Sequence, residues 1–221
     1  MTLLSGHFIH GVDLEDFYPC WNLALMGTLS SPDYSVSTDA GLFASNQSIR
    51  DTPIERLRTV GLPPGMVSPR ARCLISTANA DGHVTKRRNV ELAFEEARRS
   101  LAPDAPSRLS SLYLAEDSQA GRNHVRSMLG SDIHILRVSV PICVRSRKVD
   151  TTWFDCYWND PAEKYIENYW ASAQVEPVCA TWELLVDGVI QVDDIAGLDY
   201  LKANGAHLKV QPDGVFGRIS R

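Results

Sequence analysis

Alternating hydrophobic and polar positions mark several segments of the chain, and such alternation is typical of β-strands. The clearest of these segments are residues 3–10, residues 107–117 and residues 133–144. Pro141 lies within the last segment and indicates a bulge or an edge position, because proline has no N–H to donate to a neighbouring strand. The pattern therefore predicts strands that are well separated along the chain.

Other segments repeat hydrophobic residues at the spacing of an α-helix. Residues 89–101 are the clearest example, with Asn89 as a suitable N-cap and Pro103 directly beyond the C-terminal end. Further helices are expected after Asp13, over residues 118–129, after Asp160-Pro161-Ala162-Glu163, and over residues 196–203 behind Asp194.

The segment from Cys179 to Val192 reads as a β-hairpin, because two apolar runs flank the pair Asp187-Gly188. Asp-Gly readily adopts the positive φ angles of a type I′ turn. Glu183 stands inside the first apolar run, where a carboxylate is costly to bury unless it is paired, neutralised or used. Glu183 therefore either points to solvent from an edge strand or has a chemical role.

Strands and helices do not alternate as βαβ units, so we expect an α+β fold with antiparallel sheets. Residues 27–88 are rich in Gly, Ser, Pro, Asp and Asn and are read mostly as loop, with one short strand after Arg70. The sequence thus predicts a single domain over residues 1–221, with a loop-rich elaboration around residues 27–88.

The composition is that of a protein with a substantial core, since 44% of the 221 residues are hydrophobic and 22% are charged. The formal net charge of −5 argues against a broad phosphate-binding surface. It leaves room for a local basic patch, and Lys86-Arg87-Arg88 is the candidate. No segment is long and apolar enough to span a bilayer, so no membrane partner is expected.

Cysteine usage speaks against a metal site and against a disulfide framework. None of the five cysteines belongs to a Cys-x-x-Cys pair, and their number is odd. Cys143 or Cys156 with His134 would be the residue types of a thiol hydrolase, but no local motif supports that reading. The N-terminus lacks a secretory signal, which predicts a cytoplasmic protein or an effector exported without a cleaved signal peptide.

Three segments, each on a predicted strand, resemble the ADP-ribosyltransferase superfamily in their order. They are Phe8-Ile9-His10-Gly11, Leu112-Tyr113-Leu114-Ala115 and Thr181-Trp182-Glu183-Leu184. More narrowly they resemble its His-Tyr-Glu branch, which holds poly-ADP-ribose polymerases, RNA phosphotransferases and many bacterial toxins. Residues 165–186 are also similar to a poorly characterised bacterial group within that superfamily.

The resemblance implies two packed antiparallel sheets that form an NAD cleft flanked by helices. It implies that Glu183 is the catalytic residue, because a carboxylate stabilises the oxocarbenium-like ribose that forms when nicotinamide leaves. NAD would be bound through His10, followed by Gly11, at the adenosine half, through Tyr113 stacked on nicotinamide, through Ser110 or Ser111 nearby, and through Arg108 at the pyrophosphate.

The activity that the resemblance implies is transfer of ADP-ribose from NAD to a macromolecular acceptor, protein or nucleic acid, with release of nicotinamide. Two alternatives remain open at this point. One is NAD hydrolysis without transfer, and the other is a non-catalytic nucleotide-binding module of the same fold. A toxin of this group would also have an antitoxin or immunity partner.

Overall fold

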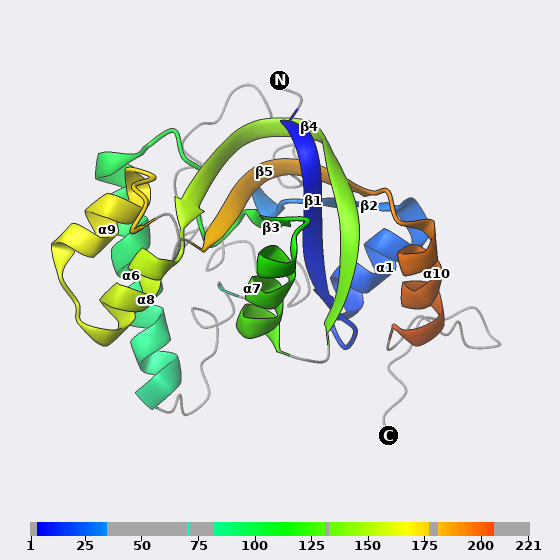
Figure 1. Ribbon diagram of the computed structural model, residues 1–221, viewed down its shortest axis with the longest axis horizontal. Helices are drawn as coiled ribbons and strands as arrows, with labels where there is room; N and C mark the ends of the chain where they lie inside the picture. Colours follow the sequence, from blue (N-terminus) through cyan, green and yellow to red (C-terminus); the bar gives the residue numbers. More distant parts are fainter. Residues whose placement is uncertain (1–3, 35–69, 71–81, 131–132, 177–180, 206–221) are drawn as a thin grey trace. The chain divides into compact units, whose positions relative to one another are not determined.

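The computed structural model describes residues 4–34, 70, 82–130, 133–176 and 181–205, and these form a mixed α+β fold (Figure 1). Its strands make one antiparallel sheet in the order β2-β5-β3-β1-β4, with an additional pairing between β5 and β4. The strands are β1 (Leu4–Asp13), β2 (Thr28–Ser30), β3 (Leu112–Glu116), β4 (Ile133–Asp150) and β5 (Trp182–Val192). The helices are α1 (Phe17–Met26), α6 (Gly82–Leu101), α7 (Gln119–Leu129), α8 (Thr152–Asn159), α9 (Glu163–Trp170) and α10 (Ile195–Asn204).

The α+β class with antiparallel strands is confirmed, but the described residues form one sheet where we expected two packed sheets. The reason lies in β4, whose 18 residues are enough for it to pair with more than one strand. It pairs with β1, with Asp13 opposite Ile133 and Leu4 opposite Val140, and it also pairs with β5.

The described chain falls into two compact units. The first unit takes its described residues from Ser30–Tyr113 and Ile142–Gly188, and the second takes them from Leu3–Leu29, Leu114–Pro141 and beyond Val189. Strands β3, β4 and β5 each contribute residues to both units.

The first unit is built on α6, α8 and α9. Its core joins Phe94 of α6 to Tyr169 and Trp170 of α9, and Phe154 and Tyr157 of α8 pack against it. Phe94 meets the rings of Phe154, Tyr157 and Tyr169 at centroid distances of 5.0–5.4 Å. Offset and edge-on aromatic pairs of this kind add to the stability gained from burial alone.

The second unit is smaller, and its core lies between β1 and α7. Ile9, Ala115 and Val125 are buried together there. Helix α7 begins as the sequence predicts, with the Ser118 side chain accepting a hydrogen bond from the Gly121 N–H at 3.0 Å. Helix α10 is also confirmed, and the Asp194 side chain caps it through the Gly197 N–H at 2.9 Å.

The hairpin expected between Cys179 and Val192 is wrong, because β5 runs through Asp187 and Gly188 as one strand. Gly188 has no positive φ angle. A Cβ atom there would lie 2.0 Å from the carbonyl oxygen of Ile142, so glycine is needed for the close approach of β4. Asp187 is buried and accepts a hydrogen bond from the Ser31 hydroxyl at 2.9 Å.

Helix boundaries differ from the sequence pattern in two places. Helix α6 begins at Gly82, well before the expected N-cap Asn89, so Lys86-Arg87-Arg88 lie within the helix. The helix expected after Asp160 begins at Glu163, and Asp160 instead ends α8, which the hydrophobic pattern did not predict. The aromatic residues of α8 are only half-buried, so their spacing follows no single buried stripe.

Some expectations lie outside the described residues. The short strand after Arg70 and nearly all of the loop-rich segment 27–88 before Gly82 are among them. Within the part of the chain that the structure describes, no helix combines the length and the apolar character that crossing a membrane requires.

Candidate functional site

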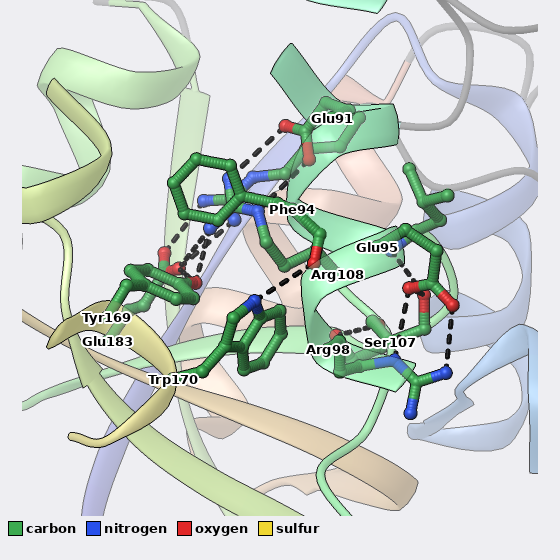
Figure 2. A network of polar contacts seen from close by, with 12 residues as sticks. Glu91, Phe94, Glu95, Arg98, Ser107, Arg108, Tyr169, Trp170 and Glu183 are labelled. Atoms are coloured by element: carbon green, nitrogen blue, oxygen red, sulfur yellow. Dashed lines mark hydrogen bonds and ion pairs between the residues drawn. The ribbon is translucent and has the colours of Figure 1, made fainter. Parts of the chain in front are cut away.

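Glu183 is at the centre of a buried polar cluster in the first unit (Figure 2). It lies on β5 with 1% of its surface exposed. Its Oε1 accepts hydrogen bonds from Arg70 at 3.0 Å, from Arg108 at 3.2 Å and from the Tyr169 hydroxyl at 3.0 Å. The alternative that Glu183 points to solvent from an edge strand is therefore wrong.

Arg70 makes the closest contacts to this carboxylate. Its Nη1 and Nη2 meet Oε1 and Oε2 of Glu183 at 3.0 and 2.7 Å, which is the bidentate geometry of a strong ion pair. The same guanidinium lies 3.8 Å from the centroid of the Tyr113 ring. Burial and the nearby Arg108 disfavour the charged form of Arg70, yet the pairing with Glu183 leaves its pKa above the ordinary value.

Arg108 has a carboxylate of its own. Its Nε and Nη2 bind Oε2 and Oε1 of Glu91 at 3.0 and 3.2 Å, and its Nη1 donates to the Tyr169 hydroxyl. The guanidinium also lies 4.2 Å from the centroid of the Phe154 ring. Arg108 thus links α6 and α9 to the carboxylate of Glu183.

The charges of this cluster balance among the described residues, since Arg70 and Arg108 face Glu91 and Glu183. All of these side chains are buried, and removing one partner of a buried ion pair is strongly unfavourable. Tyr169 and Tyr113 complete the cluster as hydroxyl-bearing aromatic residues. Figure 2 shows Glu91, Arg108, Tyr169 and Glu183 converging on one another from α6, the segment before β3, α9 and β5.

A second buried network supports the segment that carries Arg108. Arg98 donates to both oxygens of Glu95 at 3.1 and 2.8 Å and to the carbonyl of Ala105 at 3.0 Å. The Ser107 hydroxyl donates to Glu95 at 2.7 Å. Helix α6 therefore fixes the residues that directly precede Arg108, and this network provides the rigid backing that a preorganised site requires.

The tyrosine hydroxyls of the cluster stay protonated at neutral pH. The hydroxyl oxygen of Tyr113 is buried although the residue as a whole is half-buried, and burial raises the pKa of Tyr113 to about 12. Burial also raises the pKa of Tyr169 well above its ordinary value. Both side chains are therefore available as hydrogen-bond donors near Glu183 over the physiological range.

The structure brings together four of the residues that the sequence singled out, although their contacts differ from the expected ones. Glu183, Tyr113, Ser111 and Arg108 all belong to the first unit. The Ser111 hydroxyl donates to the carbonyl of Ser107 at 2.7 Å, so it stabilises the turn. Arg108 is engaged by Glu91, Tyr169 and Glu183.

His10 and Gly11 belong to the second unit. His10 is half-buried on β1 and lies opposite Leu136 of β4. Gly11 has a packing role, because a Cβ atom there would lie 2.5 Å from Cγ1 of Val125 and 2.8 Å from Cδ1 of Leu129. The presence of glycine after His10 is thus explained by α7 packing against β1 without any ligand.

Sequence reasoning missed Arg70, Glu91 and Tyr169 as members of the site. Tyr169 belongs to the buried face of α9, but nothing in the spacing indicated a polar partner. Glu91 shares the buried face of α6 with Val90 and Phe94, and a carboxylate on an otherwise apolar face was the available signal. Arg70 lies 113 residues before Glu183, and no local pattern reports such a pairing.

The cluster suits a reaction that develops positive charge, because a fixed carboxylate beside an aromatic face stabilises a cation. In the described ranges, no group of at least three His, Cys, Asp or Glu side chains is placed to hold a metal ion.

Comparison with known proteins places the chain in a family. A family model described as "Protein of unknown function (DUF2441)" matches residues 66–197, well over half of the 221 residues. The matched range contains Arg70, Glu91, Arg108, Tyr169 and Glu183, so it covers the whole buried cluster. No curated protein matches the chain. The chain belongs to the DUF2441 family of proteins of unknown function.

Proposed function

We propose that this protein transfers ADP-ribose from NAD to a macromolecular acceptor and releases nicotinamide. The observation that supports the proposal best is the placement of Glu183, a buried carboxylate that shares Arg70 with the face of the Tyr113 ring. The resemblance of the segments around His10, Tyr113 and Glu183 to the His-Tyr-Glu branch of ADP-ribosyltransferases supports it independently.

In this reaction the bond between the nicotinamide nitrogen and C1′ of the ribose breaks, and nicotinamide leaves with the bonding electron pair. The ribose then carries oxocarbenium character, which Glu183 stabilises electrostatically. A nucleophilic atom of the acceptor forms the new bond to C1′ and loses its proton. Tyr113 offers the aromatic face for the nicotinamide ring.

Arg108 has a positioning role in this proposal. Its guanidinium is bound by Glu91 and Tyr169 as well as by Glu183, so it sets the orientation of the catalytic carboxylate. This replaces our expectation of a direct pyrophosphate contact for Arg108. A group held in place by packing and hydrogen bonds keeps the site within the narrow geometry that catalysis demands.

The direct test measures nicotinamide release from NAD by the wild-type protein and by Glu183→Gln. Loss of one oriented electrostatic stabiliser commonly costs about 10²–10³ in rate. Glu167→Gln, at an exposed position on α9, is the matched control and should keep wild-type turnover. A folded Glu183→Gln variant with turnover within a few-fold of wild type would remove Glu183 from the reaction.

A binding measurement tests the residue proposed to stack on nicotinamide. Tyr113→Ala should weaken NAD binding by roughly 1–3 kcal/mol, because the stacking contact is lost. Isothermal titration calorimetry gives the value. Unchanged affinity would place the nicotinamide contact elsewhere.

A second candidate is a non-catalytic nucleotide-binding module, and one observation favours it. Both oxygens of Glu183 are engaged by Arg70, which is how a purely structural ion pair would look. The NAD assay separates the candidates, because a binding module takes up the nucleotide without releasing nicotinamide. The NAD glycohydrolase alternative is recognised in the same assay by free ADP-ribose as the product.

A further inference from the structure

We propose that the Glu183 carboxylate and the Tyr113 ring form a binding site for a planar organic cation, which the Arg70 side chain occupies in this structure. The inference rests on the proposed function, because the nicotinamide ring of NAD is itself a planar cation until its bond to ribose breaks. It adds to that function the chemical class of ligand that these two side chains would select and the internal group that competes for them.

The geometry of Arg70 defines what the site accepts. Its guanidinium carbon lies 3.8 Å from the centroid of the Tyr113 ring, which is stacking distance for a flat cation on an aromatic face. The edge of the same group meets the Glu183 carboxylate at 3.0 and 2.7 Å. A ligand with one charged flat face and donors or partial positive charge along one edge reproduces both contacts.

The charge balance shows why the site would bind a cation once Arg70 is removed. Arg108 also reaches Glu183, but only through Nη1 at 3.2 Å, and its other contacts go to Glu91 and Tyr169. Removing the Arg70 side chain would take away the bidentate contact at 3.0 and 2.7 Å and would open a volume between the Glu183 carboxylate and the Tyr113 ring. A buried carboxylate that loses a close cationic partner favours a cation in that volume.

This arrangement predicts competition between Arg70 and the nicotinamide end of NAD. If both use the face of Tyr113 and the carboxylate of Glu183, removing the Arg70 side chain should strengthen binding of a nicotinamide cation. If Arg70 instead served as an anion-binding residue for the pyrophosphate, removing it would leave a nicotinamide cation unaffected and would weaken NAD binding. The two roles therefore give opposite results.

The first experiment is rescue of Arg70→Ala by guanidinium ion. Thermal unfolding is followed in low-millimolar guanidinium chloride, with sodium chloride at equal ionic strength and with urea, a neutral planar molecule, as controls. Guanidinium should raise the Tm of Arg70→Ala more than that of wild type, and neither control should do so. Equal responses to guanidinium and to sodium chloride would overturn the proposal.

A charge-balanced double variant serves as the control for the folding of Arg70→Ala. In Arg70→Ala/Glu183→Gln the remaining Arg108 and Glu91 still pair, so this double variant should fold and should gain nothing from guanidinium. An Arg70→Ala protein that folds only when guanidinium is present supports the proposal. An Arg70→Ala protein that stays unfolded at every guanidinium concentration, while the double variant folds, overturns it.

The second experiment titrates 1-methylnicotinamide, a planar cation without phosphate, into wild type and Arg70→Ala by calorimetry. Arg70→Ala should bind it with an about tenfold lower Kd, equivalent to about 1.4 kcal/mol. Equal or weaker binding contradicts the proposal. Failure of this proposal can be told apart from failure of the proposed function. If guanidinium stabilises Arg70→Ala but the wild-type protein releases no nicotinamide from NAD, only the reaction is refuted. If nicotinamide is released but guanidinium does not stabilise Arg70→Ala, only the cation site is refuted.

Discussion

Arg108 binds both oxygens of Glu91, with Nε–Oε2 and Nη2–Oε1 distances of 3.0 and 3.2 Å, and both side chains are buried. The pair connects α6 to the segment before β3. Because Nη1 of the same guanidinium reaches Glu183, the position of α6 is coupled to that of the candidate catalytic carboxylate. The stability of the first unit and the geometry of its site therefore depend on the same ion pair.

Replacing Glu91 should reveal this coupling. Glu91→Gln leaves Arg108 with one buried partner fewer, and breaking a buried pair typically costs about 3–5 kcal/mol. Urea denaturation should show that loss in the free energy of unfolding. Glu96→Gln is the matched control on the same helix, since Glu96 is exposed, and its change should stay within about 0.5 kcal/mol. Equal denaturation midpoints for the two variants would show that the Glu91–Arg108 pair adds nothing to the free energy of unfolding.

Tyr113 should resist ionisation at high pH. Its pKa is raised from 10.0 to about 12 by burial, so the folded protein keeps a proton that the unfolded chain releases near pH 10. The associated stability is fully present below about pH 10 and is lost as the pH rises towards 12. Unfolding free energies measured across this range should therefore fall more steeply for wild type than for Tyr113→Phe.

The control for that experiment is Tyr200→Phe, because Tyr200 is 49% exposed on α10. Ultraviolet absorbance of the folded proteins provides an independent check. A tyrosinate signal that appears late in the titration of wild type should be missing from Tyr113→Phe. Parallel stability curves for all three proteins would contradict the burial of the Tyr113 hydroxyl.

Local signals in the sequence predicted those parts of the fold that local chemistry determines. The helix expected over residues 118–129 and the helix expected behind Asp194 are both present as α7 and α10. A cap such as Asp194 acts within a single turn, so a local signal is enough to locate it. The turn expected at Asp187-Gly188 fails because distant residues decide that conformation. Ser31 donates a hydrogen bond to Asp187 across 156 positions, and the Ile142 carbonyl excludes any side chain at Gly188.

The residues of the candidate site also differ in whether a local signal in the sequence could identify them. Glu183 could be identified because a carboxylate in an apolar run must have a partner or a use. Its partners could not, since Arg70 lies 113 positions away and Arg108 lies 75 positions away. Ion pairs between residues so far apart leave no periodic pattern in a single sequence. Tyr113 and Arg108 were identified through the resemblance, and their contacts became known only from the structure.

Gly188→Ala should destabilise the protein far more than a typical exposed substitution. The added Cβ would lie 2.0 Å from the Ile142 carbonyl oxygen, and backbone cannot yield as a flexible side chain does. Overpacking of this kind costs typically about 1–3 kcal/mol and at times more. Thermal unfolding should show a markedly lower Tm.

Gly82→Ala is the matched control, because a Cβ atom there meets nothing within 4 Å at the beginning of α6. Alanine also has the higher helix propensity, so this variant should equal or slightly exceed wild type in stability. If Gly188→Ala unfolds at the same temperature as Gly82→Ala, β4 and β5 do not approach each other as closely as described.

The basic cluster Lys86-Arg87-Arg88 is the place to test acceptor choice, and the structure adds an aromatic neighbour to it. These residues lie in the first half of α6, where Lys86 is exposed. The Lys86 ammonium lies 4.8 Å from the centroid of the Trp158 ring. The ring centroids of His83 and Trp158 are 5.3 Å apart. Basic side chains beside an aromatic face are the combination that binds single-stranded nucleic acid, through phosphates and through stacking.

Replacing all three basic residues of the cluster with Ser should therefore separate the two halves of the proposed reaction. Nicotinamide release without acceptor should be unchanged, whereas transfer to a nucleic-acid acceptor should fall at low salt and differ less from wild type at high salt, where phosphate contacts are already weak. Lys148→Ser is the control, because that lysine also lies 4.8 Å from a tryptophan ring centroid, that of Trp182, yet belongs to β4. Transfer should be measured for both variants with the same labelled oligonucleotide. Equal transfer by the triple variant and by wild type at low salt would exclude the cluster from acceptor choice, and an equal loss in Lys148→Ser would show that the effect is not specific to α6.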